Sequence, residues 1–180
     1  MLLALSAQTQ AQTYQQNVRA ALDALAQDSL TLAEGLLRKA LTQEPALKSN
    51  AILFQHLGRI QERRGQQIEA LESYSMGLNL SPTTLGLLLD RASLYLRRGD
   101  EKHALADYDD VLNLNADHQE ALFFRAWCYF NLVRAFGEVP LVTIKVVEAS
   151  DANVPKTTAE KIYEQIDKDL TEAEECLPLR

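Results

Sequence analysis

Residues 104–116, ALADYDDVLNLNA, repeat the pattern of residues 70–82, ALESYSMGLNLSP, and of residues 33–45, AEGLLRKALTQEP. Each stretch opens with alanine and carries a large residue four positions later. The large residues are Leu37, Tyr74 and Tyr108. The second stretch starts 37 residues after the first, and the third starts 34 residues after the second. This regular recurrence predicts an array of similar structural units, each too small to bury its apolar face alone.

Small residues upstream of these stretches keep the same spacing. They are Ala21, Gly58, Ala92 and Ala126, separated by 37, 34 and 34 residues. Small side chains let two helices approach closely, and the larger residues then fill the space between helix pairs. We therefore expect Ala70 and Ala104 to be buried where the two helices of a pair cross. The expected helices cover residues 13–26, 29–43, 50–64, 66–79, 82–98, 101–114, 118–136 and 158–176.

Local signals mark the starts of several of these helices. The residues suited to N-cap positions are Asp28, Ser81, Asp100 and Asp117, because a short polar side chain can accept a hydrogen bond from a free N–H of the first turn. Pro82 suits the first turn of the helix over 82–98, where its missing N–H costs nothing.

The repeat resembles that of the tetratricopeptide-repeat (TPR) family over residues from about 14 to 136. The resemblance implies an all-α fold, in which antiparallel helix hairpins form a TPR-type right-handed superhelix. Residues 13–117 would form three hairpins, and residues 118–180 a fourth one that contains an inserted loop over 138–156. Proteins of this family hold partners in a groove lined by the first helix of each hairpin.

The fourth hairpin departs from the repeat because its second helix is delayed. Gly137 to Pro140 should end the helix over 118–136, and extended chain follows in the insertion. Thr157 and Glu160 have capping-box spacing before the last helix. Both helices carry apolar stripes that lack another sequence neighbour, so we expect 158–176 to dock on 118–136. We expect this docking to cover Trp127 and Phe130.

Two segments of this region resemble the SusD/RagB family: FRAWCYFNLV (124–133) continuing to Val142, and TAEKIYEQI (158–166) continuing to Pro178. Proteins of that family are outer-membrane nutrient-binding lipoproteins of Bacteroidetes that capture glycans or peptides on a TonB-dependent transporter. The resemblance implies a role in the bacterial cell envelope, with a TonB-dependent transporter as one partner. This chain has no cysteine near residue 1 that could carry a lipid anchor.

The first residues suggest export. Residues 1–7 are mostly apolar and the following stretch to Thr13 is polar, with Thr9 and Ala11 placed for cleavage after Ala11. Residues 1–12 are therefore interpreted as the remnant of a signal peptide, which predicts a periplasmic or outer-membrane-associated protein. The alternative is the frayed start of the first helix.

The composition and the motifs argue against several other functions. A net charge of -7 without a basic stripe disfavours nucleic acid, and no apolar run is long enough to span a membrane. The sequence lacks phosphate-binding glycine loops and hydrolase motifs, so we expect no enzyme, no cofactor and no metal. His103 and Asp107 lie one helical turn apart and more often mark surface contacts than a ligand pair. Cys128 and Cys176 are either small apolar residues of helices or a disulfide.

Positions that face the groove in the TPR family give the candidate partner-binding residues of this chain. They are Gln55, Arg59, Arg63, Leu89, Ser93, Leu96, Arg97, Phe123, Trp127 and Phe130. Aromatic anchors beside arginines suit a protein or peptide partner. The alternative is that the three aromatic residues pack on the helix over 158–176 as ordinary core. The basic residues with which chaperone-binding TPR proteins hold a terminal carboxylate are replaced here by Val18, Leu22, His56, Gly86 and Asp90.

Overall fold

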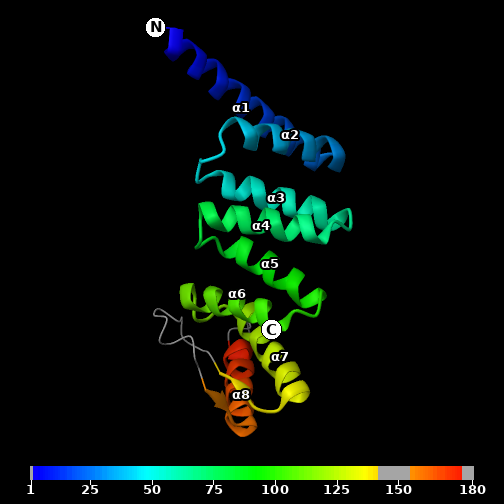
Figure 1. Cartoon of the computed structure of the whole chain (residues 1–180), viewed down its shortest axis with the longest axis vertical. Coiled ribbons are helices and arrows are strands. Elements are labelled where there is room, and N and C mark those ends of the chain that lie inside the picture. The colour runs from blue at the N-terminus through cyan, green and yellow to red at the C-terminus, as the bar shows by residue number, and fades with distance from the viewer. Residues whose placement is uncertain (1, 142–154, 176–180) are drawn as a thin grey trace. The chain divides into compact units, whose positions relative to one another are not determined.

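The computed structural model describes residues 2–141 and 155–175, and most of these residues are helical (Figure 1). The helices are α1 (Leu2–Ala26), α2 (Leu30–Gln43), α3 (Asn50–Arg63), α4 (Gln67–Leu80), α5 (Leu85–Arg97), α6 (Glu101–Leu114), α7 (Gln119–Phe136) and α8 (Ala159–Glu175). Two short strands, β1 (Val139–Pro140) and β2 (Lys156–Thr157), lie between α7 and α8. The expected all-α fold class is confirmed, and α2 to α8 match the expected helices to within about three residues.

Helix α1 is longer than expected because it already begins at Leu2. Residues 2–12 contain leucine, alanine and glutamine but no glycine or proline, so nothing in them opposes a helix. The side chains of residues 1–11 lie outside the described part of the structure. The interpretation of residues 1–12 as the remnant of a signal peptide therefore stays a prediction.

Of the N-caps predicted for α6 and α7, the one for α6 is confirmed and the one for α7 is wrong. The Asp100 carboxylate accepts a hydrogen bond from the backbone N–H of His103, as expected for the start of α6. The N-cap of α7 is His118 rather than Asp117, because the imidazole Nδ1 accepts from the N–H of Ala121. His118 thus caps the third residue after it, and α7 begins one residue later than an Asp117 cap would give.

The predicted N-caps Asp28 and Ser81 are wrong. Asp28 adopts a positive φ of 58° before α2, and its carboxylate accepts a hydrogen bond from Arg63 at 2.7 Å. Ser81 follows the last turn of α4 and lies in a turn, so α5 begins only at Leu85. Pro82 therefore precedes α5 instead of lying in its first turn.

The chain divides into two compact units, residues 1–87 and residues 88–180. In the first unit α1 packs on α2 and α3 packs on α4 as antiparallel hairpins. Ala70 is fully buried, as predicted. A side chain on Gly58 would lie 2.3 Å from the ring of Tyr74, which explains why this crossing requires the smallest residue. The repeat spacing thus marks real helix crossings.

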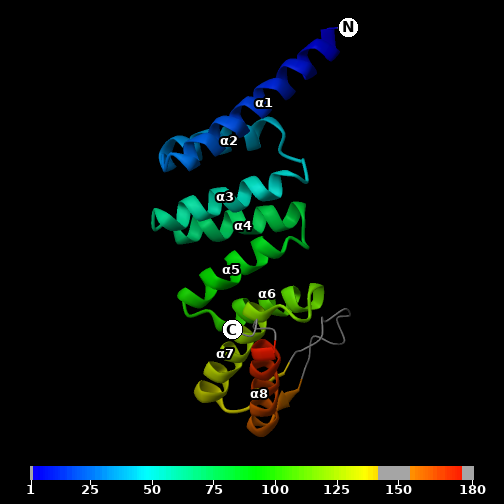
Figure 2. The same ribbon diagram turned by 180° about the vertical axis from the view of Figure 1, so that it is seen from behind.

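The second unit contains most of α5 together with α6, α7 and α8. Helices α7 and α8 lie side by side in both views (Figures 1 and 2), so the predicted docking of the last helix is confirmed. Their shared core contains Ala126, Tyr129, Val133, Val139, Ile162 and Ile166. Strands β1 and β2 pair in antiparallel fashion, with Val139 opposite Thr157, and join the two ends of the insertion. The predicted extended chain after Leu141 lies outside the described residues.

Replacing Ala104 with leucine is expected to lower the free energy of unfolding by about 1–3 kcal/mol, because Ala104 has no exposed surface and three extra carbon atoms would overpack the crossing. The matched control is Ala106→Leu, two residues later on an exposed face of α6, which should change stability by less than about 0.5 kcal/mol. Thermal melting measures both. Equal melting temperatures for the two variants would show that the repeat register is wrong.

Candidate binding surface

The three candidate groove residues of α3 have different surroundings. Gln55 is buried, and a side chain added at Gly86 would lie 2.7 Å from its amide nitrogen, so Gln55 packs beneath the start of α5. Arg59 and Arg63 are exposed, and Arg63 donates to Asp28 at 2.7 Å. In this part of the predicted groove, the side chains of Arg59 and Arg63 are accessible to a partner, whereas the amide of Gln55 is buried.

On α5 the candidate residues form one face of the helix. Leu89, Ser93, Leu96 and Arg97 lie at three-, four- and one-residue steps, which places them on neighbouring turns. The first three are partly exposed and Arg97 is exposed. Arg97 donates to the hydroxyl of Ser93 at 2.8 Å, which orients the guanidinium along the helix. The face combines an apolar strip with one oriented cation.

Helix α7 carries the most apolar part of the candidate surface, which we call the aromatic stripe and define as Phe123, Trp127 and Phe130. Phe123 is 47% exposed and Trp127 is 49% exposed. The rings of Trp127 and Phe130 lie 6.5 Å apart, and the guanidinium carbon of Arg134 lies 5.2 Å from the centre of the Phe130 ring. That distance allows a cation–π interaction. The stripe is thus a run of ring surfaces that ends on a positive charge.

The alternative in which these rings form ordinary core against the last helix is wrong for Phe123 and Trp127. Helix α8 packs on a different face of α7, formed by Ala126, Tyr129 and Val133. Only Phe130 also reaches that core, as a partly buried residue. Residues three and four apart share a helix face, so α7 carries two apolar stripes and α8 covers one of them.

A hollow of about 440 Å³ lies between the start of α7 and the end of α8. Phe123, Phe124 and Leu170 line it, with Glu120 and Glu174 among the polar residues of its wall. The ring of Phe123 meets Phe124 edge-on at 5.3 Å, and Phe124 stacks on Tyr108 at 5.5 Å. Because Tyr108 is fully buried, Phe123 rests on a fixed aromatic base.

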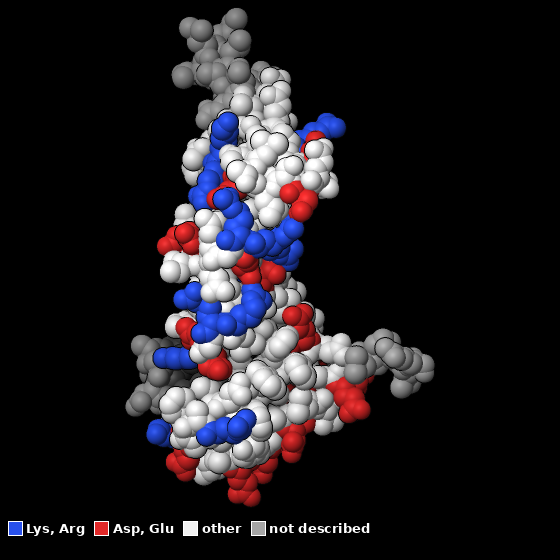
Figure 3. All heavy atoms as spheres, turned by 90° about the vertical axis from the view of Figure 1, so that its right-hand side faces the viewer, with Lys and Arg blue, Asp and Glu red and all other residues white. Residues whose placement is uncertain are grey.

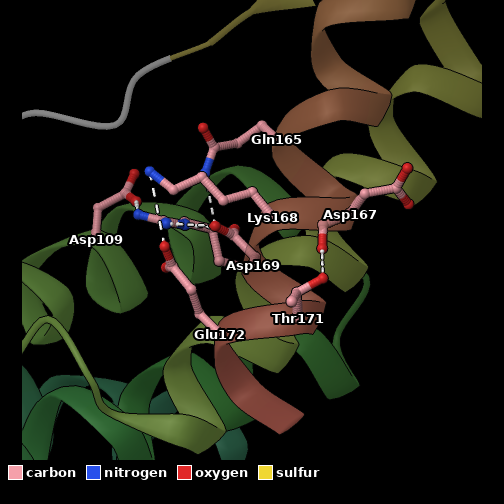
Figure 4. Close-up of polar contacts among 8 residues, drawn as sticks. Asp109, Gln165, Asp167, Lys168, Asp169, Thr171 and Glu172 are labelled. Carbon is pink, nitrogen blue, oxygen red and sulfur yellow. Dashed lines mark hydrogen bonds and ion pairs between the residues drawn. The ribbon is translucent and has the colours of Figure 1, made fainter. Parts of the chain in front are cut away.

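A buried ion cluster fixes the orientation of α7. Arg125 donates two hydrogen bonds to the carboxylate of Asp169 on α8, at 2.6 and 2.7 Å, and a longer one of 3.4 Å to Asp109 on α6. Figure 4 shows Asp109 and Asp169 directed toward one centre from these two helices. Gln165 also donates to Asp169. The cluster turns the buried face of α7 inward and thereby leaves the aromatic stripe outward.

The carboxyl group of Asp109 is the weaker partner in this cluster. Burial raises the pKa of Asp109 to about 7, against the lowering effect of Arg125, and the nearby carboxylates of Asp169 and Asp110 raise it further. Its side chain is only 14% exposed. No sequence pattern predicted the cluster, since Arg125 and Asp169 are 44 residues apart.

His103 and Asp107 have different hydrogen-bond partners. Asp107 accepts two hydrogen bonds from Arg91, at 2.6 and 2.9 Å, while the His103 ring contacts Asp100 at 2.7 Å. Cys128 is a buried free thiol whose pKa burial raises to about 12, and Cys176 lies outside the described residues. Within residues 2–141 and 155–175, no three His, Cys, Asp or Glu side chains group closely enough to hold a metal ion.

The net charge of the chain is confined to the second unit. Residues 88–180 contain 18 acidic and 11 basic side chains, whereas residues 1–87 contain 7 of each. Figure 3 shows acidic side chains gathered over the second unit, in the lower part of the view. In the described part of the chain, no helix combines the length and the apolar character needed to cross a bilayer.

Comparison with known proteins gives similarities of two kinds. Residues 99–180 match the model of a SusD-like family described as "starch-binding associating with outer membrane". A SusD-like protein P2 from Formosa agariphila is 41% identical over 71 residues, which are 39% of this chain and 14% of that protein. The match begins in front of α6, 25 residues before Phe124, where the resemblance in the sequence begins.

The solved structures that are similar to this chain are TPR proteins. One from Parabacteroides merdae has a TM-score of 0.71 and 30% identity, covering 91% of this chain and 53% of its own length. MamA from Desulfovibrio magneticus has a TM-score of 0.65 at 12% identity, and the match covers 91% of this chain and 75% of the MamA chain. The second TPR of Spaghetti, bound to an HSP90 peptide, has a TM-score of 0.53 at 17% identity, and the match covers 72% of this chain and 94% of the Spaghetti chain.

These relatives differ from this chain in extent. The chain spans about half the length of the Parabacteroides protein and about a seventh of the length of the Formosa protein. The fold is nevertheless of the TPR type along most of the chain. Its C-terminal part, from residue 99 onward, resembles SusD-like proteins.

Proposed function

We propose that this chain is a non-enzymatic helical-repeat module of the bacterial cell envelope that binds a protein or peptide through the aromatic stripe of α7. The observation that carries the proposal is the half exposure of Phe123 and Trp127 on a helix that packs on α8 through a different face, formed by Ala126, Tyr129 and Val133. Exposed contiguous apolar surface of this kind marks interaction sites in proteins of ordinary composition. Tryptophan is also the residue most enriched among binding hot spots.

The setting of the stripe supports a role in recognition. The ion cluster around Arg125 holds α7 in place, so its exposed rings are already oriented before a partner arrives. Arg134 at the end of the stripe supplies a cation for a carboxylate or a carbonyl of the partner. The predicted groove residues of α5, from Leu89 to Arg97, are proposed as further contacts of this partner within the second unit. Those of α3, from Gln55 to Arg63, are proposed as a contact surface of the first unit by itself.

The envelope location and the nature of the partner are proposals that rest on the SusD-like resemblance and on the apolar start of the chain. We propose export to the periplasm or to the outer membrane. Within that setting, a TonB-dependent transporter is the protein partner that the resemblance favours.

A second candidate function is the binding of a glycan as a SusD-like component, or a fragment of one, in outer-membrane nutrient uptake. The family description and the hollow beside Phe123 support this reading. The hollow is of the size of a small-molecule site, and its apolar lining with two flanking carboxylates is compatible with a sugar ring and its hydroxyl groups. Both candidate functions place the ligand against Phe123. They therefore differ in the kind of ligand, a peptide or a glycan, and not in the position of the site.

The deciding experiment uses Trp127, which is the single tryptophan of the chain. Peptides selected on the chain from a displayed library, and maltoheptaose as a starch oligosaccharide, are each titrated while the emission of Trp127 is recorded. A blue shift with peptides and none with maltoheptaose supports the protein-binding function, and the reverse supports the glycan function. Peptide binding without any change in emission would place the ligand elsewhere and refute the proposed surface.

Replacing Trp127 with alanine is expected to weaken the binding of a selected peptide at least about tenfold, because truncation of a central aromatic anchor removes 1.4 kcal/mol or more of binding free energy. Calorimetry measures the affinity. The matched control is Tyr163→Ala on α8, an aromatic residue that is 43% exposed and lies outside the stripe. Equal losses in the two variants would contradict a specific role of Trp127.

A further inference from the structure

The aromatic stripe of α7 continues at both ends into a charged residue. The resulting line along the helix contains Glu120, Phe123, Trp127, Phe130 and Arg134, of which Phe130 is partly exposed and the other four are exposed. Successive members are three or four residues apart, so they share one helix face. Glu120 and Arg134 each lie seven residues from Trp127, which is two helical turns to within about 20°. The stripe therefore runs between an acid and a base that are equally far from its tryptophan.

The charged groups of this surface are not used inside the chain. Among residues 2–141 and 155–175, no hydrogen bond or ion pair involves the side chains of Glu120, Arg134 or Glu174. The guanidinium of Arg134 contacts only the ring of Phe130, at 5.2 Å from the ring centre. Glu120 and Glu174 lie together in the wall of the hollow between the start of α7 and the end of α8.

The hollow offers what an arginine side chain needs. Its apolar lining of Phe123, Phe124 and Leu170 suits the methylene groups of the side chain, and its two carboxylates suit the guanidinium. Its volume of about 440 Å³ leaves room for such a side chain. Arg134 of the same chain cannot enter it, because fourteen residues of α-helix separate Arg134 from Glu120 by roughly 21 Å.

A second copy of the chain brings the two ends together. If two α7 helices pack antiparallel about a two-fold axis at Trp127, residues at equal distances on either side of Trp127 face each other. Glu120 of one copy then faces Arg134 of the other, and the same pair forms again at the opposite end, as in any two-fold symmetric interface. A parallel arrangement would bring like charges together, which disfavours it.

We propose that two copies of this chain associate through the aromatic stripe, with α7 antiparallel to α7 and with Arg134 of each copy in the hollow of the other. The inference rests on the proposed function, because it takes the stripe to be a protein-binding surface, and it names a second copy as a partner. Trp127 lies at the centre of this interface, where it packs against Trp127 of the second copy.

The interface is small, so the dimer is weak. A buried aromatic side chain covers roughly 150–250 Å², and Phe123 and Trp127 are each about half exposed. The two rings thus contribute roughly 200 Å² in each copy, well below the roughly 800 Å² per partner of a standard stable interface. We expect a dissociation constant between about 1 µM and 1 mM. At lower concentrations the stripe is open to another partner.

Sedimentation equilibrium of the whole chain up to about 1 mM measures this association. A reversible monomer–dimer equilibrium is expected. Over the same range the emission of Trp127, the single tryptophan, should shift to the blue, because its ring loses contact with water. A chain that is monomeric at every concentration would overturn the proposal.

Two charge variants test the antiparallel pairing. Glu120→Arg and Arg134→Glu each place like charges at both ends of the dimer and should each weaken self-association at least about fivefold. An equimolar mixture of the two should form a heterodimer, because every facing pair then has opposite signs. Recovery on mixing also shows that both variants are folded. If mixing restores nothing, the pairing is wrong.

Further variants check the direction and the position of the interface. The double variant Glu120→Arg/Arg134→Glu exchanges the two charges and should associate about as strongly as the parent. Trp127→Ala should weaken association at least about tenfold. The matched controls Tyr163→Ala and Glu164→Gln, at exposed positions of α8, should leave it unchanged. Association that Trp127→Ala does not weaken would place the interface elsewhere and overturn the proposal.

A peptide selected on the chain separates a failure of this inference from a failure of the proposed function. The peptide should dissociate the dimer, because both occupy the rings of the stripe, and a dimer that persists at saturating peptide would overturn the inference. A monomeric chain whose Trp127 emission shifts on peptide binding would overturn the dimer and leave the proposed function standing. If neither peptide nor concentration changes that emission, both fail.

Discussion

Replacing Arg125 with methionine is expected to lower the free energy of unfolding by about 3–5 kcal/mol, and the melting temperature by roughly 10 °C. Asp169 has no solvent exposure, and Arg125 is the cation that compensates its charge. Without the guanidinium, a carboxylate would remain buried between α7 and α8 with only the amide of Gln165 as a partner. Melting followed by circular dichroism measures the loss.

Two further variants separate the lost ion pair from a general loss of packing. The double variant Arg125→Met/Asp169→Leu removes both charges and should recover most of the lost stability, since apolar residues of similar size often replace a buried pair without cost. Arg63→Met removes a guanidinium whose pair with Asp28 is exposed on both sides, and should cost less than about 1 kcal/mol. The interpretation fails if the double variant is no more stable than the single one.

Replacing Asp109 with asparagine is expected to stabilise the chain at pH 8 by on the order of 2–4 kcal/mol. The pKa of Asp109 is about 7 in the folded chain, while the usual value is 3.8. Between these two values the folded state holds a proton that the unfolded state has released, so stability falls as the pH rises from about 4 to 7. A shift of three pKa units corresponds to roughly 4 kcal/mol as an upper limit.

The measurement is the pH dependence of urea unfolding for the parent and for the Asp109→Asn variant. The parent should lose stability between about pH 4 and pH 7, and the variant should lose much less over the same interval. The charges that face Asp109 are Arg125 from α7, Asp169 from α8 and Asp110 from α6 itself. Asp117→Asn, on the exposed turn before α7, serves as the control and should follow the parent. Parallel curves for all three proteins would contradict the raised pKa.

The helices and their crossings could be predicted from the sequence because they depend on local patterns. Alanine at 70 and 104 recurs at a fixed spacing, and each of these positions is a buried crossing. The docking of α8 on α7 followed from two apolar stripes without another neighbour. These inferences need no knowledge of which distant side chains meet.

The choice of the buried face of α7 was harder, and the expectation that α8 covers Trp127 is wrong. The helix has two apolar stripes, and periodicity alone does not tell which one is covered. The repeat contained the missing signal, since Ala126 is in register with the buried Ala92 and lies on the face that packs against α8. When only the residues of α7 are considered, the large side chains Trp127 and Phe130 are the ones expected to be buried. Exposure of the large aromatic rings is also what makes this face a candidate site.

The two-residue pairing of β1 with β2 makes the segment between Pro140 and Lys156 a suitable insertion site for protein engineering. Pro140 lies opposite Lys156, and such partners in an antiparallel pair are about 5 Å apart, so chain that leaves the hairpin at one residue re-enters it at its neighbour. Each doubling of the length between them costs only about 0.6 kcal/mol in closure entropy. An epitope tag, a fluorescent reporter or a folded domain inserted between Pro140 and Lys156 would be anchored at both ends by the β1–β2 pair. Its insertion should therefore not strain the packing of α7 on α8.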